Sequence, residues 1–267
     1  MNNLYRDLAP ISAGAWRQIE EEAARTLKRY MGARRVVDLH GPSGGELASV
    51  GTGHLKPLGS LDGEVQASLR ESKPLVQLRR PFKLTRSAID DVERGSNDSD
   101  WSPLKEAARR IAYAEDRAVF EGYAAGAIEG FRQVASNPSL TLPAEPDAYP
   151  EVVAAAVNEL RMSGVEGPYC LVLGQAPFTL INGASESGYP VAKHLRQLVD
   201  EEIVWSPALS GGIVLSTRGG DFDLYLGQDV SIGYLSHTAD EVELYLQETF
   251  TFIMQTSEAA VLLQGAG

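Results

Sequence analysis

Cysteine is nearly absent from this sequence of 267 residues. Cys170 is the only one, so no disulfide can form within the chain. Such usage fits a reducing compartment, and we expect the protein in the cytoplasm. Cys170 lies inside the apolar run YCLVLG, which favours a buried structural thiol over a nucleophile.

Long apolar runs and excess positive charge are also missing. No run approaches the roughly 18–20 apolar residues that span a bilayer, and the first residues, MNNLYRDLAPISAG, do not resemble a secretory signal. Lys and Arg number 24 against 36 Asp and Glu, a net charge of −12. We therefore expect no membrane partner and no nucleic acid partner, since phosphate binding needs a cationic surface.

The motifs of common enzymes are absent too. The sequence has no phosphate-binding G-x-x-x-x-G-K-[ST] loop, no dinucleotide-binding glycine pattern after a strand, and no G-x-S-x-G nucleophile turn. Its histidines are scattered without metal-ligand spacing: His40, His54, His194 and His237. Asp221 and Asp223 share a face of a strand but lack a partner for acid–base work, so we expect them on an exposed or interfacial sheet face. No catalytic residue and no metal site is predicted.

Two helices dominate the first half of the chain. Ser12 is a suitable N-cap for a helix whose apolar residues, from Trp16 to Tyr30, recur every three or four positions. Ser102 is the expected N-cap of a second helix of some twenty residues, with Pro103 at its first position and a stripe of small residues on one face. Between them, residues 41–63 are rich in glycine and residues 74–84 turn strand-like, in a segment that cannot form a core of its own. This segment is either a flexible loop or an arm that a neighbouring subunit completes.

The second half mixes helices and strands. Residues 136–220 alternate between the two and predict a small α/β unit. From residue 222 the apolar residues alternate, break at a turn over 227–229, and resume over 230–234. A long strand is predicted next, over 241–255. The overall class is α+β.

Several segments together resemble the encapsulin shell proteins of family 1, the linocin type. They are LYRDLAPIS, RRVVDLHGPSGGE, DDVERG, EGPYCLVLG, GGDFDLYLGQDVSIGY and ETFTF. The resemblance covers nearly the whole chain and implies the HK97-type phage capsid fold with an added N-terminal amphipathic helix. The implied parts are an N-terminal arm and helix with the start of the P-domain (1–44), an E-loop (45–80), a P-domain with spine helix (81–135), an A-domain (136–220) and further P-domain strands (221–267).

The resemblance implies a structural function rather than an enzymatic one. Copies would assemble into a closed T=1 icosahedral nanocompartment of about 60 chains in the cytoplasm. The shell would enclose a cargo enzyme through that enzyme's C-terminal targeting peptide. A dye-decolourising peroxidase is the first candidate cargo and a ferritin-like protein the second. A phage major capsid protein remains an alternative, as does a secreted bacteriocin or protease-like factor.

The resemblance also implies a groove for the targeting peptide, between the first helix and the P-domain sheet. Its predicted residues are Leu27, Tyr30 and Met31 for apolar contact, Arg34 and Asp38 for polar contact, and Asp229, Val230 and Ile232 as the opposite wall. The alternative is that these are ordinary core residues. If they form the groove, we expect Arg34→Glu with Ile232→Asp to give intact but empty shells.

A second implied site is a pore at the fivefold axis. Its predicted residues are Gly183, Ala184, Ser185, Glu186, Ser187, Gly188 and Tyr189, and the carboxylate of Glu186 would favour cations. The alternative is an ordinary surface loop. Some family members carry a flavin stacked on an aromatic residue in the short helix before ERG. Here that helix has Ser87 and no aromatic residue, so no flavin or other cofactor is expected.

Overall fold

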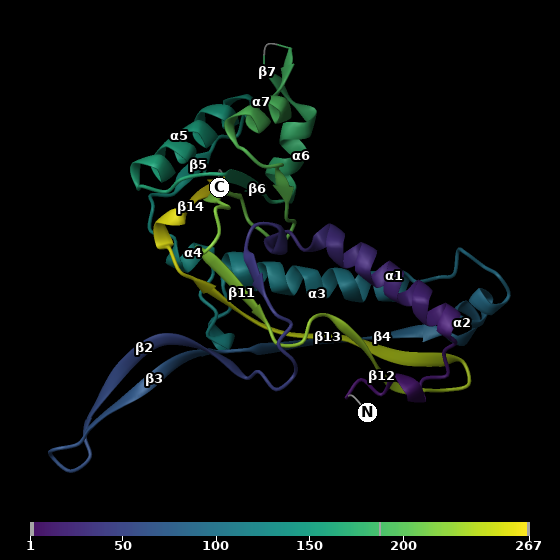
Figure 1. Cartoon of the computed structure of the whole chain (residues 1–267). Helices are drawn as coiled ribbons and strands as arrows, with labels where there is room; N and C mark the ends of the chain where they lie inside the picture. The colour runs from purple at the N-terminus through teal and green to yellow at the C-terminus, as the bar shows by residue number, and fades with distance from the viewer. Residues whose placement is uncertain (1–2, 187, 266–267) are drawn as a thin grey trace.

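The described part of the chain forms two five-stranded sheets with their own helices, one long projecting hairpin and one short hairpin (Figure 1). The computed structural model describes residues 3–186 and 188–265. The α-helices are α1 (Ala13–Tyr30), α2 (Arg86–Glu93), α3 (Ser102–Glu121), α4 (Phe131–Val134), α5 (Tyr149–Met162), α6 (Gln175–Gly183) and α7 (Val191–Leu198). The strands are β1 (Asp38–His40), β2 (Ser49–Ser60), β3 (Gln66–Pro74), β4 (Val76–Thr85), β5 (Leu140–Leu142), β6 (Tyr169–Leu173), β7 (Ser185–Glu186), β8 (Tyr189–Pro190), β9 (Val204–Trp205), β10 (Gly212–Ser216), β11 (Phe222–Leu226), β12 (Ser231–His237), β13 (Glu241–Met254) and β14 (Ala260–Gly265). None of the described helices has the length and apolarity to cross a bilayer.

The first sheet is built around the long strand β13. It pairs with β4 along one edge and with β11 and β12 along the other, all antiparallel, while β1 adds parallel to β11. Side chains alternate across a strand, so Leu244, Leu246 and Phe250 turn to the same face and are fully buried there. Helices α1 and α3 cover the sheet (Figure 1).

Both helices begin close to where the sequence indicates. The Ser12 hydroxyl accepts a hydrogen bond from the Ala15 amide at 3.1 Å, which confirms Ser12 as the N-cap of α1. In α3 the N-cap is Trp101, and Ser102 is the first helical residue, so the sequence placed the cap one residue late. The buried stripe of α3 includes Ala107, Ala108 and Ala112, whose small size lets the helix lie close to its neighbours.

The second sheet has the strand order β5-β14-β10-β6-β9, and α5 and α7 pack together beside it. Its last strand corrects the sequence-based division, which assigned all of residues 221–267 to the first sheet. After β13 the chain crosses back, and β14 pairs antiparallel with β10 and parallel with β5. The apolar residues Val261 and Leu263 are buried in the second core as a result.

The glycine-rich segment forms a two-stranded hairpin, β2 and β3, that projects away from both sheets (Figure 1). A structureless loop is therefore excluded. The hairpin carries large aliphatic side chains that are 53–83% exposed: Leu55, Leu58, Leu61, Val65 and Leu69. An isolated two-stranded ribbon with an exposed apolar surface is marginal in water unless it packs on another structure.

The two aspartates at the start of β11 are buried, which corrects the expectation of an exposed or interfacial face. Asp221 is 3% exposed and forms two hydrogen bonds with the Arg218 guanidinium, at 2.9 and 3.0 Å. Asp223 is 8% exposed and contacts His40 Nε2 at 2.7 Å and Gln255 Nε2 at 2.8 Å. Their partners explain why both carboxylates tolerate burial.

Candidate functional site

The C-terminal end of α1 is fixed by a buried carboxylate of α3. Asp116 accepts hydrogen bonds from the backbone amides of Gly32, at 2.9 Å, and Ala33, at 3.0 Å. It also accepts one from the Ser206 hydroxyl, at 2.6 Å, which ties in the segment after β9. A Cβ atom on Gly32 would lie 2.7 Å from the Ser206 Cβ, so the close approach requires glycine. Burial raises the pKa of Asp116 to about 7, although these hydrogen bonds oppose the change.

The next short turn, η2 (Ala33–Arg35), places Arg34 among three carboxylates. Its guanidinium donates to Glu115 of α3 at 2.6–3.0 Å, to Asp229 of the β11–β12 turn at 2.7 Å, and to Glu248 of β13 at 2.9 Å. The Glu115 and Glu248 side chains are 0% exposed, and that of Arg34 is 14% exposed. One cation therefore holds together a helix, a turn and the central strand.

The cluster has more negative than positive charge. Burial, followed by the neighbouring charge of Glu115, raises the pKa of Glu248 well above its usual range. One oxygen of Glu248 has no hydrogen-bond partner among the described residues. Burial disfavours the charged form of Arg34, but its bonds to Glu115, Glu248 and Asp229 outweigh this and raise its pKa. The charged guanidinium of Arg34 thus compensates for the burial of Glu115 and Glu248.

A groove of about 670 Å³ lies above this cluster, between α1 and the β11–β12 turn. It is lined by Ala24, Leu27, Lys28, Met31, Arg34, Arg35, Asp229 and Val230. Five of the predicted groove residues are brought together here: Leu27, Met31, Arg34, Asp229 and Val230. Apolar side chains with a few polar anchors form the kind of surface that holds a short peptide.

The other three predicted residues lie elsewhere. Tyr30 turns to the opposite flank of α1, where its ring centroid lies 5.5 Å from that of Trp205 and 6.0 Å from that of Tyr113. Ile232 is 6% exposed and belongs to the core beneath α1. Asp38 lies in β1, and its carboxylate accepts a hydrogen bond from the Gly220 amide at 2.6 Å. These three do not line the groove.

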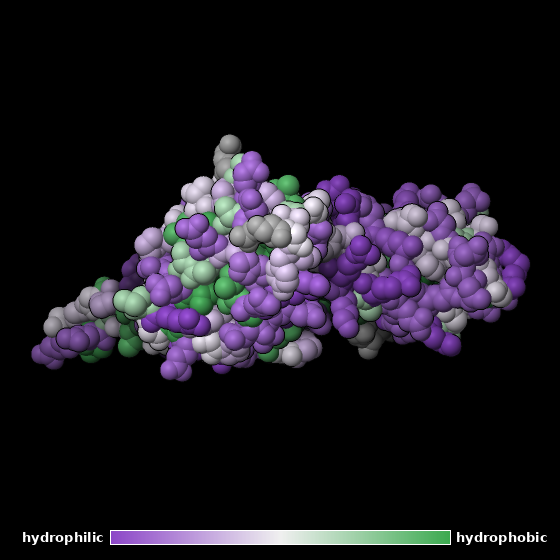
Figure 2. Space-filling model, turned by 90° about the horizontal axis from the view of Figure 1, so that it is seen from above, coloured by the Kyte–Doolittle hydropathy of each residue, from purple (hydrophilic) through white to green (hydrophobic). Residues whose placement is uncertain are grey.

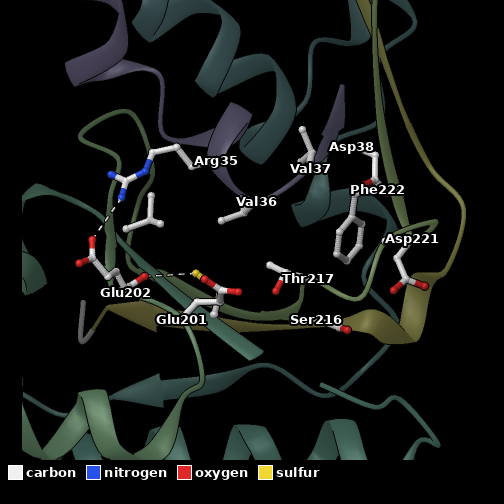
Figure 3. Close-up of a pocket in the computed structure, with 13 residues that line it drawn as sticks. Arg35, Val36, Val37, Asp38, Glu201, Glu202, Ser216, Thr217, Asp221 and Phe222 are labelled. Atoms are coloured by element: carbon white, nitrogen blue, oxygen red, sulfur yellow. Dashed lines mark hydrogen bonds and ion pairs between the residues drawn. The ribbon is translucent and has the colours of Figure 1, made fainter. Parts of the chain in front are cut away.

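Asp38 instead lines a separate cavity of about 540 Å³ between the two sheets (Figure 3). Cys170 forms part of its wall and donates a weak hydrogen bond to the Glu202 carbonyl at 3.5 Å. Burial raises the pKa of this thiol to about 12, so at neutral pH it is not a thiolate nucleophile. The part of the chain that the structure describes contains no cluster of three or more His, Cys, Asp or Glu suited to a metal ion.

The predicted pore residues lie at the far end of the second sheet's domain (Figure 1). Gly183 ends α6, Ser185 and Glu186 form β7, and Tyr189 begins β8, so the segment is a small hairpin. Tyr189 is 44% exposed, and Gly188 has a φ of +84°, which glycine adopts without strain. Ser187 lies outside the described residues.

The sequence is similar to those of known proteins over almost the entire chain. The family described as "Encapsulating protein for peroxidase" matches residues 1–251. A type 1 encapsulin shell protein of Rhodococcus erythropolis is 57% identical over 98% of this chain and 100% of its own length. The chain belongs to the encapsulin shell protein family. The corresponding proteins of Mycobacterium tuberculosis and Rhodospirillum rubrum are 56% and 45% identical, and both alignments cover at least 97% of each chain.

Solved structures show which fold this encapsulin family member adopts. A virus-like particle protein from Pyrococcus furiosus aligns with a TM-score of 0.63 at 17% identity, covering 93% of this chain and 99% of that one. The capsid protein of a Myoviridae phage aligns with a TM-score of 0.55 at 12% identity, covering 88% and 92%. These likenesses confirm the predicted phage capsid fold. The resemblance to encapsulins is likewise confirmed, by the family match and by the relatives that share about half of their residues with this chain.

Two buried partners of Arg34 were not predicted as part of the site. Glu115 occupies a position in the small-residue stripe of α3, and Glu248 stands where an apolar residue would continue the alternation of β13. A carboxylate at an apolar position is the signal in each case, because burial there requires a partner. The sequence could not show that the partner of both is Arg34.

Proposed function

We propose that this protein is the building block of a closed T=1 icosahedral shell of about 60 copies that encloses a peroxidase. The role is structural rather than enzymatic. The observation that carries the proposal is the β2–β3 hairpin, whose aliphatic side chains have no partner within the described part of the chain's own body. In a shell, this hairpin packs on neighbouring copies.

The hairpin's exposed side chains indicate how strongly assembly would be favoured. Full burial of a large aliphatic side chain contributes roughly 1.5–3 kcal/mol. With half to four fifths of five such side chains still exposed, contact with neighbours would contribute on the order of 5–9 kcal/mol per copy. That is enough to make the arm a main determinant of assembly.

Deletion of residues 50–69 tests this proposal. The deletion removes most of the hairpin and none of the residues in the two cores. We expect a folded protein that elutes as protomers or small oligomers in size-exclusion chromatography. A normal particle in electron micrographs of the deletion variant would contradict the proposal.

For the cargo, we propose that a C-terminal targeting peptide docks in the groove between α1 and the β11–β12 turn. Leu27, Met31 and Val230 would receive its apolar side chains, while Arg34 and Asp229 would offer one donor and one acceptor group. The description of the matching family supports a peroxidase as cargo. Cargo that still co-purifies after the groove is made polar would argue against this site.

Two further assignments complete the proposal. The hairpin that includes Glu186 and Tyr189 lines a pore where copies meet, and the carboxylate of Glu186 favours the passage of cations. The shell resides in the cytoplasm, which accords with a single, buried, unpaired cysteine. Fractionation of the source cells, with the shell followed by immunoblot, tests the location.

A further inference from the structure

A second cleft, on the opposite flank of α1 from the groove, has unusual charge for this protein. It lies between α1 and α3 and has a volume of about 570 Å³. It is lined by Glu22, Arg25, Thr26, Arg29, Tyr30, Ser102, Lys105, Glu106 and Arg109. Four of these residues are cationic and two are anionic, a local excess of two positive charges in a chain with a net charge of −12.

The two acidic residues of the cleft are already shared among bases. Glu22 is only 8% exposed, and it contacts both Arg25 and the Lys105 ammonium, the latter at 3.5 Å. Glu106 contacts the Arg109 guanidinium at 2.6 Å and also that of Arg110, at 2.7 Å. Each carboxylate therefore divides its charge between two cations.

Arg29 is the cation with the fewest partners. Its guanidinium lies 6.0 Å from the centroid of the Tyr30 ring. Arg25, Lys105 and Arg109 each form an ion pair, whereas Arg29 forms none with any described residue. Asp100 is near the mouth of the cleft, where its carboxylate accepts a hydrogen bond from the Ser102 amide at 2.9 Å. An added anionic group would thus meet Arg29 directly and the shared cations beside it.

The first two residues of α3 offer a phosphate group no free backbone amide. Phosphates bind at helix N-termini through free backbone amides. At the start of α3, the Ser102 amide is already bonded to Asp100, and Pro103 has no amide hydrogen. The side-chain donors that line the cleft can bind carboxylate oxygens without any backbone amide. The neighbouring groove for an extended peptide is what favours an acidic peptide segment as the source of those carboxylates.

The cleft and the groove are separated only by α1. Thr26, Arg29 and Tyr30 face the cleft, whereas Leu27, Lys28 and Met31 face the groove. Figure 2 shows hydrophilic residues dominating the half of the molecule away from the hairpin, where α1 and α3 lie. A helix is about 10 Å across and an extended chain advances about 3.3 Å per residue, so about three residues suffice to cross α1.

We propose that the cleft between α1 and α3 binds an acidic segment of the same cargo tail whose apolar segment occupies the groove. The acidic residues lie about three positions from the apolar anchor, so that the tail crosses α1 and contacts both of its flanks. The proposal rests on the proposed function of the groove. It assigns the cleft a role in selecting among tails that carry similar apolar segments.

The test uses two synthetic fluorescent peptides. The acidic probe has four glutamates, three glycine or serine residues and a leucine-containing apolar segment. The neutral probe has glutamine in place of each glutamate. Each is added while the purified full-length protein reassembles, and retained probe is measured after size-exclusion chromatography at about 50 mM and about 0.5 M salt, which screens exposed charges.

At low salt we expect the acidic probe to be retained about tenfold more than the neutral one. Each exposed ion pair strengthens binding about threefold, and the probe would form two such pairs, with Arg29 and Lys105. The difference should vanish at high salt. Arg29→Ala with Lys105→Ala should reduce retention of the acidic probe to that of the neutral probe. The matched control, Lys193→Ala with Arg196→Ala, removes the same charge from exposed positions of α7 and should leave the tenfold difference.

Several results would overturn the proposal. Equal retention of the two probes would do so, as would a difference that persists in the Arg29 and Lys105 variant. Displacement of the acidic probe by an equimolar thymidine oligonucleotide would assign the cleft to nucleic acid instead. In Leu27→Gln, which changes only the groove, both probes should be retained less. Acidic-probe retention unchanged by Leu27→Gln would show that one tail does not span both sites.

The same data distinguish failure of the cleft proposal from failure of the proposed groove. If Leu27→Gln lowers retention of both probes but the two were equal on the unaltered protein, the groove stands and the cleft does not. If neither probe is retained, both fail.

Discussion

Replacement of Arg34 by methionine removes the only guanidinium from a cluster with three carboxylates. Two of these, Glu115 and Glu248, are fully buried and have no other cation among the hydrogen bonds and ion pairs of the described residues. Leaving a buried charge without its partner destabilises a protein by about 3–5 kcal/mol. For a chain of this size each kcal/mol lowers the melting temperature by roughly 2–4 °C, so a decrease of about 6–20 °C is expected.

The loss of stability in Arg34→Met should become smaller as the pH falls. The charge of Arg34 lowers the pKa of Glu248, so its removal moves that pKa further above the usual value. At any pH between the unfolded and the folded pKa, the folded variant binds more protons at Glu248 than the unfolded chain does. Stability of the variant therefore rises as the pH falls from 8 toward 5, and its difference from the unaltered protein narrows.

Differential scanning fluorimetry at pH 5 and pH 8, at one scan rate, measures both effects. Arg35→Met is the matched control, because the Arg35 side chain is 46% exposed and its nearest carboxylate, on Glu202, is 4.0 Å away. It should change the melting temperature by less than about 2 °C. An Arg34→Met variant as stable as this control, or one whose deficit does not shrink in acid, would refute the reasoning.

Three further predictions concern the groove, the contact of Asp116 with the end of α1, and the pore. Leu27→Gln should lower co-purified cargo severalfold while Leu27→Met does not, and equal loading in quantitative gels would contradict the groove. Asp116→Asn should destabilise the protein by about 1–3 kcal/mol, because its Nδ2 would face a backbone donor. Because its pKa is raised to about 7, Asp116 contributes stability that is lost as the pH rises from about 4 to about 7. The melting temperature of Asp116→Asn should therefore fall less over that pH range than that of the unaltered protein. Equal slopes of melting temperature against pH for the two proteins would exclude this role of Asp116. Glu186→Gln should slow the entry of cationic but not anionic fluorescent probes in stopped-flow quenching, and equal entry rates in the unaltered shell would contradict a charge filter.

The structure changes the choice of variants for testing the groove. Arg34→Glu with Ile232→Asp was expected to give intact, empty shells. In the fold, however, Arg34→Glu would add a fourth carboxylate to the cluster, and Ile232→Asp would place a charge in the core. That pair of substitutions should prevent folding, so an empty shell would not be informative. Leu27 is only partly buried at the edge of that core and can be changed with less damage.

Local sequence patterns predicted most of the elements, because they depend on neighbouring residues. The cap at Ser12 and the alternation in β13 reflect hydrogen bonding and burial within one segment. The crossing of β14 to the second sheet was not predicted, because its apolar residues would fit either sheet. Strand partners far apart in sequence carry no local signal of that kind.

In the candidate site too, local helical spacing was predictable and contacts between distant residues were not. Helical spacing placed Leu27 and Tyr30 on one face of the first helix, and Met31 was named only through the resemblance. In the structure, Leu27 and Met31 line the groove together. Tyr30 is adjacent in sequence but turns to the other flank, since consecutive helical residues point about 100° apart. Asp38 was separated from the groove by the η2 turn, whose direction depends on the distant Asp116.

The native mass of the purified full-length protein tests the central claim most directly. A T=1 shell of about 60 copies of the 28.8 kDa chain has a mass of about 1.7 MDa before cargo is added. Mass photometry should show one dominant megadalton species, and deletion of residues 50–69 should abolish it. A population of monomers or dimers alone, under conditions in which the protein is folded, would contradict the account.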